Sequence, residues 1–155
     1  YETLIELSKI SKKFPIAIKM HIHADINIMN AIIKKVNEKT NNGLRYFYTK
    51  LHPLVLAERS VFAISNNTST TFYDFYFKGV QTIEYGFHGK KMMEIRATEK
   101  LDESISFFVN LDQNELENSI NHAIDKYKES GNKPIGIKEE RDQQTGLDSL
   151  VKALL

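Results

Sequence analysis

Alternation of apolar and polar residues between positions 61 and 112 constrains the fold most, because successive side chains of a strand point to opposite faces. The stretch contains no proline and holds ten of the sixteen aromatic residues of the chain. Turn-forming residues separate the alternating runs. We therefore expect an antiparallel β-meander of about five strands that contains the main hydrophobic core.

The alternation also assigns a core face to each predicted strand. In the run 81–87 the apolar positions are Ile83, Tyr85 and Phe87, and Glu84 falls on the polar side. The run 71–77 is apolar at both sets of alternate positions, which is typical of a central strand with cover on both faces. The predicted sheet therefore needs a covering layer on each side.

The segments that flank the meander supply these layers. Apolar residues recur at helical spacing in three segments, 2–13, 26–40 and 113–129. Strand alternation occurs in 16–22, whereas 44–51 fits either a strand or an irregular aromatic segment. The segment 54–60 fits a helical turn or a lead-in to the first strand of the meander, and we favour the turn. The predicted fold is α+β, with the antiparallel sheet packed by the helix at 113–129 and by N-terminal helix–strand–helix elements.

Length and composition indicate one domain. A chain of 155 residues is long enough to bury a single core, which we place in residues 1–130. Residues 131–155 are predicted to form a charged linker and a short terminal amphipathic helix. The chain has no cysteine, which excludes thiol catalysis and disulfides, and it has no apolar run long enough to span a bilayer. We expect a soluble, intracellular protein of the cytoplasm.

Charge is distributed unevenly along the chain. Residues 1–60 contain ten Lys or Arg against five Asp or Glu, although the net charge of the whole chain is only +1. The overall pI near 8.0 is below the value above about 9 that is expected of a nucleic-acid-binding domain. Nucleic acid therefore stays open as a partner of the basic residues in 1–60, without being the favoured one.

His21 and His23 are the strongest candidates for chemistry. On a predicted strand they stand two positions apart and therefore point to the same side, and Asp25 follows two residues later. Neutral imidazole and carboxylate groups bind divalent Zn, Mn or Fe. The three residues are therefore a candidate metal site. The alternative is that both histidines are polar positions of an ordinary amphipathic strand.

The segment His21-Ile22-His23 resembles the His-hydrophobe-His motif of single-strand DNA nicking enzymes, the HUH nucleases. The match covers these three residues. The resemblance implies a small sheet domain in which His21 and His23 hold a divalent metal. It also implies that Tyr46 or Tyr48 is the nucleophile, with Lys50 nearby.

Apart from that segment, the sequence contains no motif with a complete catalytic set. It therefore favours a non-catalytic binding or interaction module without a cofactor, whose partner is a protein, a second copy of the chain or another ligand. The metal-dependent nuclease is the alternative function. Apolar residues without an assigned place in the core are the candidate partner contacts: Met92, Phe108, Tyr46 and Tyr48. The alternative for these residues is burial beneath the N-terminal helices.

Overall fold

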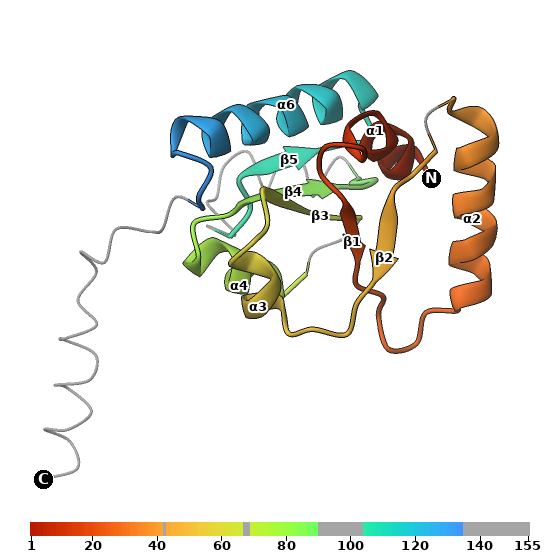
Figure 1. Ribbon diagram of the computed structural model, residues 1–155, viewed down its shortest axis with the longest axis horizontal. Coiled ribbons are helices and arrows are strands. Elements are labelled where there is room, and N and C mark those ends of the chain that lie inside the picture. Colours follow the sequence, from red (N-terminus) through yellow and green to blue (C-terminus); the bar gives the residue numbers. More distant parts are fainter. Residues whose placement is uncertain (42, 67–68, 90–103, 135–155) are drawn as a thin grey trace, which may run out of the picture.

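A computed structural model describes residues 1–41, 43–66, 69–89 and 104–134 of the chain. Figure 1 shows its helices and strands. The helices are α1 (Glu2–Ile10), α2 (Ile26–Lys39), α3 (Pro53–Ala57), α4 (Phe72–Phe77) and α6 (Gln113–Glu129). The strands are β1 (Ile16–Ile18), β2 (Tyr46–Tyr48), β3 (Phe62–Ser65), β4 (Gln81–Tyr85) and β5 (Phe107–Val109).

All strand pairs among the described residues are parallel. β1 and β2 form one sheet, and β3, β4 and β5 form a second sheet in that order. Parallel neighbours cannot be joined by a tight turn, so each pair needs a crossover segment. α2 makes the crossover between β1 and β2, and α4 makes the crossover between β3 and β4. The described chain therefore contains two successive β-α-β units.

The predicted antiparallel meander is wrong. Alternation fixes which side of a strand faces the core, but it carries no information on the direction of the neighbouring strand. The four residues Thr82–Tyr85 of β4 are all buried, on both sides of the strand. Burial on both faces is characteristic of a parallel sheet whose crossover helices cover it. The parallel arrangement thus accounts for the polar side of β4 being dry.

The segment 71–77, predicted as a central strand, forms α4 instead. Its aromatic residues also satisfy helical spacing, since Phe72, Phe75 and Tyr76 lie on one side of a helix. Phe72 is 2% exposed, whereas Tyr73 and Phe77 on the other side are 44% and 64% exposed. Short apolar runs fit a strand and a helix equally well. Here the segment is helical because it forms the crossover between the parallel strands β3 and β4.

Most other elements agree with the sequence to within a few residues. α2 and α6 occupy the predicted helical segments, and α1 ends at Ile10 instead of residue 13. α3 begins at Pro53, one residue before the predicted helical turn 54–60, and the ambiguous segment 44–51 contains β2. The predicted strand 16–22 ends at Ile18. Met92 and the predicted terminal helix lie outside the described residues.

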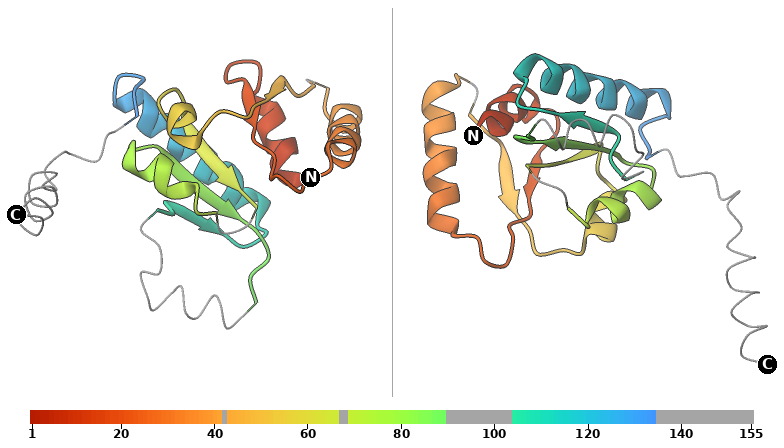
Figure 2. Two further views of the ribbon diagram at one scale, coloured as in Figure 1. Left: turned by 90° about the horizontal axis from the view of Figure 1, so that it is seen from below. Right: turned by 180° about the vertical axis from the view of Figure 1, so that it is seen from behind.

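α6 covers one face of the three-stranded sheet, and α4 lies on the other side of it, next to α3 (Figures 1 and 2). The core is centred between α6 and the sheet, where Leu116 and Ile120 pack with Ile83 and Val109. α1 contacts both α2 and α6 and so connects the two β-α-β units. Among the described residues, no helix has the length and apolar character needed to cross a membrane.

Candidate functional site

Polar side chains gather at the carboxyl ends of the three-stranded sheet. Asn66 follows β3, Glu84 lies near the end of β4, His88 follows β4, and Asn110 follows β5. These four residues are named the Glu84 cluster. In parallel α/β sheets this edge is where ligands bind, because the loops that follow the strands meet there.

Glu84 is the most buried charged residue of the cluster. Its exposed fraction is 0%, and it stands in register between Ser65 of β3 and Phe108 of β5. The His88 imidazole approaches it, with Nε2 3.4 Å from Glu84 Oε1. A buried carboxylate needs partners of this kind, because removing a charge from water is costly unless a polar group compensates it.

His88 is held by contacts on two sides. Its ring packs against the ring of Phe108, with 4.3 Å between the centroids, and its backbone N–H donates to Asn110 Oδ1 at 2.9 Å. Nε2 is buried and, within the described part of the chain, makes no hydrogen bond, because its approach to Glu84 is not aligned for one. The imidazole is thus fixed in place with an unused polar atom facing the carboxylate.

Asn66 and Gly86 bring the ends of β3 and β4 together. Asn66 Nδ2 donates to Thr3 Oγ1 at 2.9 Å and to the Tyr85 carbonyl at 3.3 Å. A Cβ atom on Gly86 would lie 2.8 Å from the Asn66 carbonyl oxygen and 3.3 Å from His88 Nε2. Only glycine fits this position without displacing the backbone of its neighbour.

The first turn of α1 closes over the same strand ends. The Tyr85 hydroxyl donates a short hydrogen bond to the Glu2 carboxylate. Burial, followed by this contact with Glu2, raises the pKa of Tyr85 to about 12. Together with the bond between Thr3 and Asn66, this contact ties the N-terminal helix to the edge that carries the Glu84 cluster.

The histidines predicted as metal ligands lie elsewhere, in the loop that follows β1. The rings of His21 and His23 are 5.3 Å apart, both residues are exposed, and the His23 backbone N–H donates to His21 Nδ1 at 3.2 Å. Asp25 caps α2 by accepting from the Asn27 N–H at 2.7 Å. The described residues contain no group of three His, Asp or Glu side chains arranged to hold a metal ion. The metal site stays a prediction from sequence.

The tyrosines of the nuclease hypothesis lie on β2. The rings of Tyr46 and Tyr48 meet edge to face at 5.5 Å, and the Tyr48 hydroxyl donates to Asn30 Oδ1 of α2 at 2.7 Å. Burial, with Tyr46 adding to it, raises the pKa of Tyr48. Lys50 is exposed beyond the end of β2. The structure therefore places the Tyr48 hydroxyl against α2 and not at the histidine loop.

Among the predicted partner contacts, Phe108 is half-buried and packs on His88 within the chain. Tyr46 and Tyr48 are partly buried against the core. Large exposed side chains occur instead on α3 and α4, among them Val55 at 51% and Phe77 at 64%. Sequence reasoning missed Phe77 as an exposed residue because it treated 71–77 as a strand.

Sequence reasoning also missed Glu84 and His88. Alternation placed Glu84 on the side of its strand opposite to Ile83 and Tyr85. That side was expected to face solvent, but Glu84 is fully buried. The only local signal was that the two residues stand four apart across the end of an apolar run. Comparison with protein-family models, with curated proteins and with solved structures found no match for this chain.

Proposed function

We propose that the chain is a binding module that holds a small polar ligand at the carboxyl ends of β3, β4 and β5. The observation that carries this proposal is the buried Nε2 of His88, which lies beside the Glu84 carboxylate without a hydrogen bond. A buried polar atom left unpaired costs about 1–3 kcal/mol. Such atoms call for an explanation, and a ligand that completes their hydrogen bonds supplies one.

The chemistry of the cluster points to a hydroxyl-bearing ligand, such as a sugar or a nucleoside. A hydroxyl group can donate to a carboxylate and accept from an imidazole N–H at the same time. Glu84 and His88 present these two functions 3.4 Å apart. Asn66 is exposed and Asn110 is half-buried at the same edge of the sheet.

A ligand-observed NMR screen of monosaccharides, nucleosides and nucleotides tests the proposal. We expect at least one compound to bind the full chain, and its affinity to fall about tenfold or more in His88→Phe and in Glu84→Gln. His88→Phe keeps a ring against Phe108 and removes the nitrogens. His122→Phe is the matched control, because His122 is exposed on α6.

Circular dichroism must show that all three variants are folded. Binding that survives both cluster variants, or that His122→Phe weakens equally, contradicts the proposed site. The absence of binding by every compound contradicts the ligand class.

The metal-dependent nuclease is the second candidate function. It is favoured by the two exposed imidazoles that share one loop, with ring centroids 5.3 Å apart. The test is cleavage of single-stranded DNA with Mg²⁺ or Mn²⁺. On this proposal cleavage is lost in the double variant His21→Ala/His23→Ala and in Tyr46→Phe or Tyr48→Phe. Wild-type protein that does not cleave, or cleavage that the histidine variants retain, removes this candidate.

A further inference from the structure

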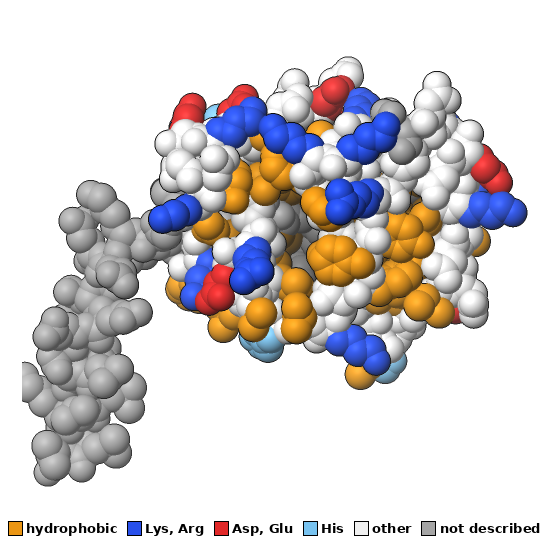
Figure 3. Space-filling model, in the orientation of Figure 1, with side chains coloured by type: hydrophobic (Ala, Val, Ile, Leu, Met, Phe, Trp, Pro, Cys, Tyr) orange, Lys and Arg blue, Asp and Glu red, His pale blue; other side chains and the backbone are white. Residues whose placement is uncertain are grey.

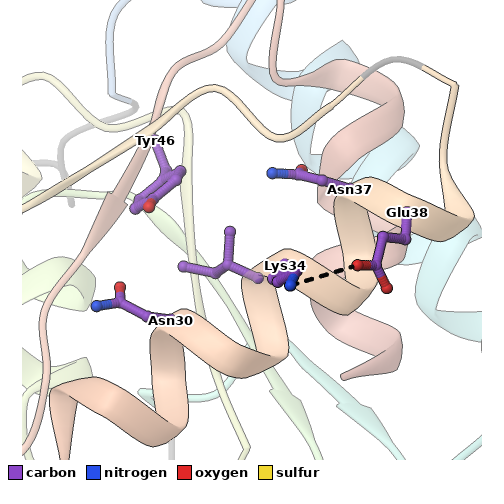
Figure 4. A pocket seen from close by; sticks show the side chains of 6 residues that line it. Asn30, Lys34, Asn37, Glu38 and Tyr46 are labelled. Atoms are coloured by element: carbon purple, nitrogen blue, oxygen red, sulfur yellow. Dashed lines mark ion pairs between the residues drawn. The ribbon is translucent and has the colours of Figure 1, made fainter.

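An open groove runs between α2 and β2, away from the Glu84 cluster. Its volume is about 600 Å³, and it is lined by Asn30, Ile33, Lys34, Asn37, Glu38 and Tyr46. Figure 4 shows Tyr46 on one side and the side chains of α2 on the other. The groove is widely open to solvent, which suits a peptide chain better than a small molecule that needs enclosure.

The two asparagines of the groove are oriented by the protein. Asn30 Oδ1 accepts from the Tyr48 hydroxyl, and Asn37 Oδ1 accepts from the Leu44 N–H, each at 2.7 Å. Because both oxygens are engaged, the Nδ2 groups are the free ends of the carboxamides. Neither Nδ2 donates to a group in the described part of the chain. The groove therefore presents two fixed pairs of N–H donors.

The spacing of these donors selects the conformation of a peptide ligand. Positions seven residues apart on a helix lie on one side, about 10.5 Å apart along its axis. A β-strand presents equivalent carbonyls about every 6.7 Å, so neither one repeat nor two match. A polyproline II helix presents them every three residues, about 9.3 Å apart, which is the nearest of these repeats to the spacing of the two asparagines.

Charge and surface character narrow the partner further. Lys34 and Glu38 lie 4.0 Å apart at the rim of the groove, so the two charges offset each other and favour neither an acidic nor a basic ligand. Tyr46, which lines the groove and meets the ring of Tyr48 edge to face, provides an aromatic surface. Figure 3 shows hydrophobic side chains gathered on this part of the surface, over β1, β2 and α2.

We propose that the groove between α2 and β2 binds a neutral, proline-rich peptide segment in the polyproline II conformation. The Nδ2 groups of Asn30 and Asn37 donate to its carbonyls, and Tyr46 packs against its proline rings. Aromatic-lined grooves recognise such segments because the peptide is already ordered before it binds. This site does not depend on the ligand proposed for the Glu84 cluster.

Titration of the full chain with decaproline, followed by NMR backbone amide shifts, tests the proposal. We expect shifts confined to α2 and β2, and an affinity about tenfold lower in Asn30→Asp and in Asn37→Asp. Aspartate keeps the oxygen that accepts from Tyr48 or Leu44 but removes the donor. Asn121→Asp, an exposed position on α6, makes the same change in charge away from the groove and should bind like wild type.

Any of four results would overturn the proposal. Decaproline could fail to bind at millimolar concentration, or bind with equal affinity to the two groove variants and wild type. A glycine-serine peptide of the same length could bind as tightly as decaproline, which would remove the role of the polyproline conformation. Maltoheptaose or an oligothymidylate could shift the same amides while decaproline does not, which would assign the groove to a carbohydrate or a nucleic acid.

Discussion

Gly86 shows how close the backbones of β3 and β4 come at the edge that carries the Glu84 cluster. A Cβ at this position would lie 2.8 Å from a backbone oxygen, the Asn66 carbonyl, which cannot move as a flexible side chain does. Gly89 stands three residues later, and a Cβ added there would meet no atom within 4 Å. Gly89 thus offers a matched control.

We predict that Gly86→Ala lowers the free energy of unfolding by about 1–3 kcal/mol, because the new methyl group must displace the end of β3. Gly89→Ala should change it by less than about 0.5 kcal/mol. Urea unfolding followed by circular dichroism measures both values. Equal effects of the two substitutions would show that the close approach of Gly86 to Asn66 does not limit stability.

Tyr85 should make stability depend on alkaline pH. Its pKa is raised to about 12 in the folded protein by burial and by Glu2, against about 10 in the unfolded chain. The folded state therefore holds the proton more tightly, so this contribution is complete below about pH 10 and is lost as pH rises toward about 12.

We predict that Tyr85→Phe makes the fall in stability between about pH 10 and pH 12 shallower, since phenylalanine has no proton to lose. Near pH 7 the variant should be less stable by about 1 kcal/mol, because the hydrogen bond to Glu2 is absent. Urea unfolding at a series of pH values gives both quantities. Parallel pH profiles for wild type and variant would contradict the assignment to Tyr85.

At the scale of the elements, local signals predicted helices better than strands. Asp112 caps α6 by accepting from the N–H groups of Asn114 and Glu115, and α6 spans the predicted residues 113–129. The prediction of a strand at 71–77 failed because its run of aromatic residues around one aspartate fits both the strand and the helix period. Its helical state depends on the crossover between β3 and β4, which is a property of the sheet and not of the segment.

At the scale of the whole molecule, strand direction was the quantity that the sequence could not provide. Alternation correctly placed Ile83 and Tyr85 in the core, but Phe87, assigned to the same face, is 79% exposed because it lies beyond the end of β4. The direction of the neighbouring strands depends on how the chain connects one strand to the next. The alternation within a single strand carries no information on that connection. Without the strand directions the Glu84 cluster could not be predicted, because its members meet only when the carboxyl ends of β3, β4 and β5 share an edge.

The two sheets differ in how well they are covered. β4 has a strand on each side and helices on both faces, whereas β1 and β2 form a two-stranded sheet. The outer face of that sheet carries Ala17 and Phe47, both exposed, with Phe47 at 49%. A two-stranded sheet is marginally stable alone, so the first β-α-β unit depends on its packing against α1 and the core.

We predict that the β1–β2 sheet opens more often than the three-stranded sheet, which native-state amide hydrogen exchange measures. The Ile16 and Thr49 amides, which bond to Arg45 and Ile18 carbonyls, should exchange with opening free energies at least about 1 kcal/mol below that of Gly86, which bonds to Val109. All three amides are hydrogen-bonded, so the difference reports opening and not a missing bond.

Leu116→Ala in α6 should lower the opening free energy of Gly86 by about 2–5 kcal/mol, because that amide is released by global unfolding. The opening free energies of Ile16 and Thr49 should fall less, because these amides exchange by local opening. The three values become equal once global unfolding costs no more than that local opening. Equal protection of the two sheets in the wild-type protein would show that they unfold as one cooperative unit.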